Sequence, residues 1–137
     1  MVKMTPSFEL EIKALDDDHQ ALMDLANRII EILDGSTVEA ADCQPLVAEF
    51  VKLSKQHFAR EEVLLTKSGY PNVEKHHDHH RSLYGKMDHM IEFAAMAAEN
   101  PLARDSLKKE LRYFLLDDVI TADMEFKDYV KDHQPPG

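Results

Sequence analysis

Apolar side chains recur every three or four positions along most of the chain, a spacing that predicts amphipathic helices. Four such stretches are separated by short breaks rich in glycine, proline or asparagine, which commonly begin or end helices. The first helix is expected to begin within residues 16–18 and to end at Gly35. The second is expected to end at Gly69, the third to begin after Pro71, and the fourth to begin at Asn100-Pro101.

The predicted inner faces of these helices combine apolar residues with residues that can bind a metal. The first face runs through His19, Leu22, Ala26, Ile29 or Ile30, and Leu33. The second helix, capped by Thr37 or Asp42, presents Leu46, Phe50, Leu53, His57, Glu61 and Leu64. The third presents His76, His80, Leu83, Met87, Ile91 or Met90, Ala94 and Ala98. The fourth presents Leu107, Leu111, Phe114, Leu115, Asp118, Val119, Ala122, Asp123, Phe126 and Val130.

Long helices joined by short connections predict an all-α fold, an antiparallel up-down-up-down four-helix bundle. One domain is expected for all 137 residues. Residues 1–16 are predicted to form an N-terminal arm, in which Phe8, Leu10 and Ile12 alternate as in a strand or in an arm packed over the bundle. Residues 133–137 are predicted to form a frayed tail.

Composition narrows the classes of function. Acidic residues outnumber basic ones by 26 to 16, for a formal net charge of −10. This argues against a nucleic-acid partner, because phosphate binding requires a basic face. Cys43 is the only cysteine, so neither an internal disulfide nor a cysteine-based metal site is expected. No apolar run reaches membrane-spanning length and the N-terminus has no secretory pattern, so we expect a cytoplasmic monomer with no membrane partner.

Two pairs of residues four positions apart are candidates for metal binding. His57 and Glu61 form the first pair, and His76 and His80 form the second. Residues four apart share a helix face, and the turn at residues 67–72 folds the third helix back beside the second. Three imidazoles and a carboxylate would then converge between two antiparallel helices. This donor set suits iron, zinc or manganese.

Each candidate also has an ordinary structural interpretation. A histidine and a glutamate four apart are usually a solvated pair, and the third helix could simply begin with a solvated histidine-rich run in which His77 and His79 face outward. His19 alone is more often a core histidine than a ligand, and Asp118 and Asp123 alone are usually surface acids. The metal hypothesis depends on their coincidence, because each of the four helices offers a metal-capable residue at an inner position.

In this order, the motifs resemble the hemerythrin family, particularly the single-domain bacteriohemerythrins, over nearly the whole chain. The features that carry the resemblance are the acidic run before His19, the sequence HFAREE at residues 57–62, Tyr70-Pro71, His76 and His80, Phe114-Leu115, and Asp123. The resemblance implies a left-handed four-helix bundle that holds two iron ions joined by an oxo or hydroxo bridge. It implies these roles: His19 and His57 on the iron open to dioxygen, His76 and His80 on the other iron, Glu61 and Asp123 bridging both, and Phe114 and Leu115 in the dioxygen pocket.

Two positions depart from the family pattern: Phe114, where the usual aromatic is tryptophan, and position 118. The family usually has a histidine five residues before the bridging aspartate, as a third imidazole on the second iron, and this chain has Asp118 there. We include Asp118 among the predicted metal ligands, binding either directly after a helix shift or through a water. An ionised carboxylate would favour the ferric state, and either arrangement could open a second exchangeable position. Alternatively, Asp118 is a tolerated ligand change, or the second iron is weakly held.

The leading functional hypothesis is a non-haem di-iron protein that binds dioxygen, or another small diatomic ligand, as a carrier, store or sensor. The alternative is a di-iron enzyme, namely an oxidase, peroxidase, ferroxidase or nitric-oxide-handling enzyme, and the Asp118 change favours it. A third class is a bundle that binds zinc or another ion for structural reasons. Whether the chain is an enzyme, and which protein partner it has, are left open.

Overall fold

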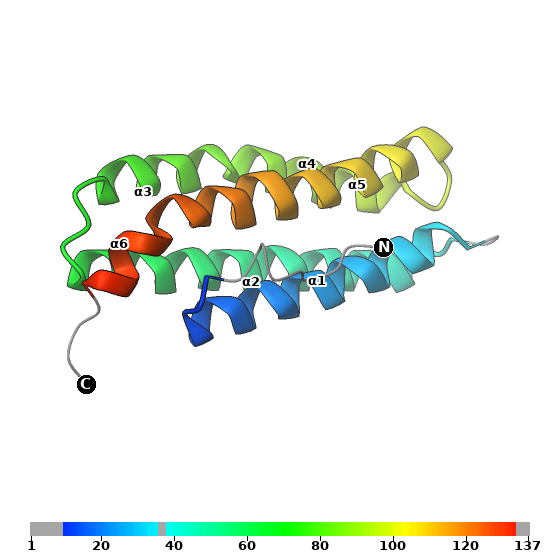
Figure 1. The fold of residues 1–137 in the computed structure, drawn as a ribbon. Coiled ribbons are helices and arrows are strands. Elements are labelled where there is room, and N and C mark those ends of the chain that lie inside the picture. The colour runs from blue at the N-terminus through cyan, green and yellow to red at the C-terminus, as the bar shows by residue number, and fades with distance from the viewer. Residues whose placement is uncertain (1–9, 36–37, 134–137) are drawn as a thin grey trace.

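The computed structural model describes residues 10–35 and 38–133, which form four helical rods packed side by side (Figure 1). The first two rods are the helices α1 (Lys13–Leu33) and α2 (Ala40–Lys67). The third rod is made of α3 (Val73–Ser82) and α4 (Tyr84–Met96). The fourth is made of α5 (Pro101–Tyr113), the π-helix η2 (Phe114–Thr121), the 3-10 turn η3 (Met124–Phe126) and α6 (Lys127–Asp132). No strand occurs among the described residues, so the predicted all-α four-helix bundle is confirmed.

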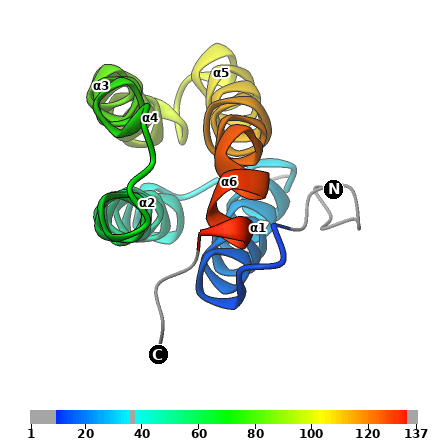
Figure 2. The same cartoon turned by 60° about the vertical axis from the view of Figure 1, so that its left-hand side comes forward.

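Each rod packs against the rod that follows it in the sequence, and α1 packs against α5 to close the ring (Figure 2). Successive rods run in opposite directions, which is the up-down-up-down arrangement (Figure 1). The last rod bends at its end, where α6 turns from the line of α5 toward the end of α2 (Figure 1). No described helix is both long enough and apolar enough to cross a lipid bilayer.

The first helix begins three residues earlier than the sequence predicts. Its N-terminal cap is Ile12, so residues 13–16 belong to the helix rather than to the arm. Asp16 lies in the first turn, where its carboxylate accepts hydrogen bonds from the backbone N–H groups of Leu10 and Glu11 at 2.8 and 3.0 Å. The acidic residue therefore holds the incoming chain from inside the helix. Leu10 and Ile12 are buried, which is the packed alternative for the arm, whereas residues 1–9 lie outside the described part.

The predicted stop of α2 at Gly69 is confirmed in detail. Gly69 has a φ of 71°, the left-handed conformation that glycine adopts most readily. The N–H of Gly69 donates to the carbonyl of Thr66, and the N–H of Tyr70 donates to the carbonyl of Leu65, which is a Schellman motif. At the N-terminus of α2 the cap residue is Glu39, and the predicted cap Asp42 lies in the first turn instead. The other predicted cap, Thr37, lies outside the described residues.

Two predicted inner faces are rotated slightly. On α2, the fully buried positions include Val47, Ser54 and Leu65, whereas the predicted Leu46, Leu53 and Leu64 are only partly buried. On α4, Met90 is buried and Ile91 is 45% exposed, which decides between the two alternatives. Ala97 is buried in place of the predicted Ala98.

The fourth rod begins as predicted and then changes its winding. The side chain of Asn100 accepts hydrogen bonds from the N–H groups of Leu102 and Ala103, and Pro101 occupies the first helical position. From Phe114 to Thr121 the backbone is a π-helix, in which each N–H bonds five residues back instead of four. Residues five apart within this segment are brought toward one face. In an α-helix, at 3.6 residues per turn, they would lie well apart around the axis.

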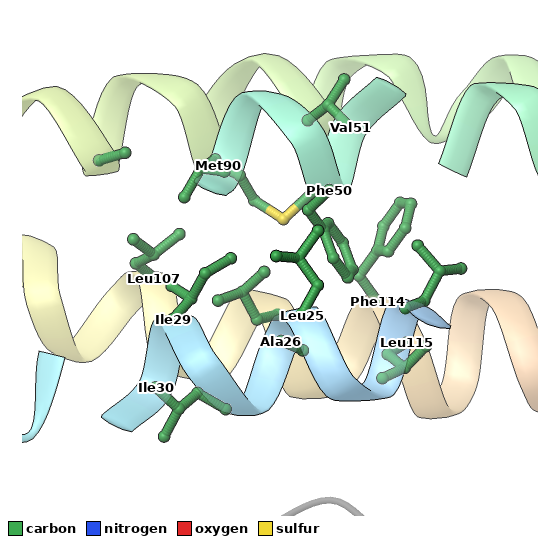
Figure 3. Packing of buried hydrophobic residues seen from close by; sticks show 14 of the residues in the cluster. Leu25, Ala26, Ile29, Ile30, Phe50, Val51, Met90, Leu107, Phe114 and Leu115 are labelled. Atoms are coloured by element: carbon green, nitrogen blue, oxygen red, sulfur yellow. The ribbon is translucent and has the colours of Figure 1, made fainter. Parts of the chain in front are cut away.

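Apolar side chains fill the bundle in two clusters, which we call the main core and the end cluster. The main core occupies most of the length of the bundle, with Phe50 and Phe114 in edge contact at 5.8 Å near its middle (Figure 3). The end cluster, near the α2–α3 turn, consists of Leu10, Ile12, Leu15, Leu65, Phe126 and Val130. Val130 belongs to α6, so the bend of the last rod helps to close this end.

Candidate metal centre

A group of buried polar side chains lies between the main core and the end cluster. On α1, His19 comes between Leu15 of the end cluster and Leu22 of the main core. The other rods repeat this order: Glu61 lies between Phe58 and Leu65, and Asp123 between Ile120 and Phe126. The polar group is therefore covered by hydrocarbon on both sides along the bundle axis. This cover limits the access of water to the group, and the electrostatic interactions inside it are strengthened.

The structure brings six of the seven predicted ligand residues together in two overlapping groups. The first group is His19, His57, Glu61 and Asp123, and the second is Glu61, His76, His80 and Asp123. In each group the four candidate ligand atoms lie within 4.8 Å of one another, and all of these residues are buried. Both groups contain two imidazoles and the same two carboxylates.

The two shared carboxylates each direct one oxygen to each group. Asp123 Oδ2 lies 2.8 Å from His19 Nε2 and 2.9 Å from His57 Nε2, whereas Asp123 Oδ1 lies 3.4 Å from His76 Nε2. Glu61 Oε1 forms an ion pair with His57, and Glu61 Oε2 lies 2.8 Å from His76 Nε2 and 3.6 Å from His80 Nε2. This division of oxygens is the geometry in which a carboxylate bridges two cations.

His80 Nε2 has no hydrogen-bond partner in this interior, and the Glu61 oxygen that faces it, Oε2, lies 3.6 Å away. An unsatisfied buried polar atom costs about 1–3 kcal/mol, so natural proteins rarely keep one without a reason. A metal ion would bind both atoms. Imidazole nitrogen and carboxylate oxygen are donors suited to iron, and two ions with two shared carboxylates would use every donor in the cluster. The residues present therefore fit a pair of iron ions.

The protonation equilibria show that the centre attracts positive charge. Burial by itself lowers the pKa of His57, but attraction to Glu61 and hydrogen bonds with Asp123 and Asp18 outweigh it and raise that pKa well above its ordinary value. For His76 burial also lowers the pKa, but hydrogen bonds to Asp123 and Glu61 raise it to about 9. Burial raises the pKa of Asp123, whereas its contacts with Glu61 and the surrounding imidazoles hold that pKa well below its usual range. A metal cation would take the place of these protons.

A second layer of acids fixes the orientation of two imidazoles. Asp18 Oδ2 lies 2.8 Å from Nδ1 of His57, and Arg60 pairs with the other oxygen of Asp18. Glu62 Oε1 lies 3.3 Å from Nδ1 of His80. Each contact leaves Nε2 of the ring directed at the centre, which is how outer carboxylates orient histidine ligands in metalloproteins. Helical spacing alone does not mark Asp18 and Glu62 as partners of these histidines, although each stands next to a predicted ligand in the sequence.

Two outward-facing histidines have partners. His77 pairs with Glu62, and it is partly buried rather than fully solvated. His79 is also partly buried, and its Nε2–H donates to the backbone carbonyl of Asp118 at 2.8 Å. Both therefore point away from the centre, as predicted, but neither is simply a surface residue.

Asp118 is the one predicted ligand that the structure leaves out of both groups. Its carboxylate pairs with Lys86 on α4 at 2.6 Å, and the Lys86 ammonium also lies over the ring of Tyr113 at 4.9 Å. In this arrangement Asp118 contributes no donor to either group, and its binding to a metal stays a prediction. Because an aspartate side chain is short, a nearby ammonium on the facing rod satisfies it better than a site deeper in the bundle. The ion pair also compensates the negative charge that the sequence analysis assigned to the metal pair.

The predicted dioxygen-pocket residues are buried beside the centre. Phe114 and Leu115 are fully buried members of the main core. Phe114 lies 6.4 Å from the ring of Phe58, which in turn stacks on His80 at 4.0 Å. The walls of the centre are thus apolar and aromatic, and Phe126 closes the other side by edge contact with His76 at 5.2 Å. A role of Phe114 and Leu115 toward dioxygen stays a prediction.

Comparison with known proteins gives one match. The family model of the hemerythrin HHE cation-binding domain matches residues 10–133. No curated protein matches the chain, and no solved structure does. The match covers all four rods and every residue of the two groups.

Proposed function

The chain belongs to the hemerythrin family, and from that membership we propose that it is a non-haem di-iron protein that binds dioxygen reversibly. His19 and His57 would hold the iron open to dioxygen, His76 and His80 would hold the other, and Glu61 and Asp123 would bridge both. A bound di-iron pair supplies the two electrons that dioxygen takes up on binding. The observation that carries the proposal is the division of the two carboxylates between the two histidine pairs.

The contribution of the protein itself is positioning and the exclusion of water. Asp18 and Glu62 orient imidazoles, and the end cluster separates the centre from solvent at its nearer end. A dry site slows the loss of a charged oxygen species to water, because a small anion is far better solvated in water than in hydrocarbon. These features favour a binding protein over one that releases its product at once.

A di-iron enzyme is the second candidate. It is favoured by the absence of Asp118 from the donor groups, which leaves the His76–His80 pair with no third imidazole. An open position on each ion suits turnover of peroxide or oxidation of a substrate better than storage. The third candidate is a helical bundle that binds zinc for structural reasons.

The deciding experiment is a metal count combined with absorption spectra of the reduced protein before and after exposure to dioxygen. Two irons per chain and a long-lived coloured adduct that bleaches under vacuum support the carrier or sensor. Immediate conversion to a diferric form with peroxide turnover supports the enzyme. Stoichiometric zinc without iron in protein purified from its source refutes both. Glu49→Ala, at an exposed position on the same helix as Glu61, serves as the control variant for Glu61→Ala.

A further inference from the structure

A small cavity lies beside the second donor group and not the first. Its volume is about 150 Å³, and its lining comes from the α2–α3 turn, from α3 and from the last rod. His76 is one of the lining residues, whereas His19 and His57 are not. On the last rod the lining residues are Ala122, which directly precedes Asp123, and Glu125. The cavity therefore reaches the imidazole that belongs to the second group.

The second group also lacks a donor that would fill its remaining position. Each group offers four protein ligands, two of them shared. An iron ion that accepts about six ligands has room left after four protein groups and a bridging oxygen. Asp118 does not take that place, because its carboxylate is held by Lys86 and its backbone carbonyl by His79. The two groups are thus equally incomplete, and this cavity lies beside the second.

The chemistry around the cavity suits a small anion. Among the described residues, the lining includes Lys75 as a cation, Tyr70 and Asn72 as neutral polar residues, and Glu125 as an acid. A cavity of about 150 Å³ has room for a ligand of a few heavy atoms. The Nε2–H of His79 is already used by the carbonyl of Asp118, which leaves Nδ1 of that ring as its remaining polar atom.

We propose that the ion held by His76 and His80 has its own exchangeable position, which takes a small monovalent anion such as azide or hydroperoxide through this cavity. The proposal rests on the proposed function, since it requires two bound irons. This second position goes beyond the proposed function, because ligand exchange at the ion held by His19 and His57 does not involve the cavity. The protein would then bind two exogenous ligands for each pair of ions.

Azide is the probe, and the number bound per diferric protein is the readout. Calorimetric titration of the wild-type protein, with iron counted in the same sample, should give two azides per chain. Replacing Ala122 by Leu fills the cavity and should weaken the second azide at least tenfold while the first is unchanged. Ala59→Leu, on the exposed surface of α2, is the matched control and should keep both. Asp118→His, which supplies an imidazole at the vacant position, should leave one azide.

The wild-type stoichiometry decides the proposal whether or not the variants fold. One azide per two-iron protein overturns it, and so does a second azide whose affinity Ala122→Leu leaves unchanged. Failure of the proposed function is recognised separately, because a chain that holds fewer than two irons, or binds no azide at all, fails before the second position is tested. A crystal structure of the azide complex should show the second anion beside His76.

Discussion

The stability of the protein after its metal has been removed by a chelator should fall as the pH rises from about 6 to about 10. The pKa of His76 is raised from 6.5 to about 9 in the folded chain by the carboxylates around it. A raised pKa stabilises the fold fully below the unfolded-state value of about 6.5, and this stabilisation is lost as the pH passes through the folded value. The difference between the two pKa values corresponds to about 3 kcal/mol for this one histidine. His57 contributes in the same direction.

The assay is urea unfolding followed by helical circular dichroism, with chelator present, at several pH values across this window. Lysine and tyrosine also titrate near its upper end, so the wild-type protein is compared with His76→Gln, which should lose most of the slope. His89→Gln, at an exposed position on α4, should keep the slope. The stability of iron-loaded protein should depend little on pH in this window, because Nε2 of His76 then binds metal rather than a proton. Stability that stays constant or rises between about pH 6.5 and pH 9 would refute the reasoning, as would an unchanged slope in His76→Gln.

Three further substitutions test separate parts of the structure. Glu61→Ala removes a carboxylate common to both donor groups, so the variant should lose both irons, and a metal count that still finds two contradicts the bridging role. Lys86→Met leaves the Asp118 carboxylate without its partner, so the reduced iron-loaded variant should oxidise faster in air than the wild-type protein. The Asp118→His variant should oxidise more slowly than the wild-type protein. The rate of the colour change measures both. Gly69→Ala places a side chain at a φ of 71°, and thermal unfolding should show a loss of about 1–2 kcal/mol from backbone strain. The new Cβ would make only an ordinary contact, 3.7 Å from the Tyr129 hydroxyl, so a much larger loss would show that strain is not the cause.

The gathering of the donor residues was predictable because it follows from helical spacing. His57 and Glu61, or His76 and His80, lie one turn apart, and the stops at Gly69 and Asn100 determine which rods face each other. These are local signals, and each is strong in the sequence. The hydrophobic pattern also placed the donors on inner faces, so their burial follows from the same argument.

The features that the sequence did not reveal depend on contacts between distant residues. The helix α1 begins before its acidic run because Asp16 accepts hydrogen bonds from the backbone of the preceding arm, a contact that a preference for acids at the N-cap does not predict. The buried face of α2 differs slightly from the predicted one, because the adjacent apolar residues at positions 46 and 47 fit the helical period equally well. The partner of Asp118 is 32 residues away on another rod, and no spacing rule selects Lys86 for it. The π-helix leaves no clear mark in the composition or spacing of the sequence.

The contact between His19 and Asp123 spans 104 positions, so the first and last rods meet at the centre. While the chain is being synthesised, the ribosome releases five of the six clustered donors well before Asp123 emerges. A nascent chain at that stage has the histidines but only one of the two carboxylates that both donor groups require. Loading with metal must therefore wait until the last rod has been synthesised, and a chain truncated within that rod would leave its histidines as an unfinished chelator.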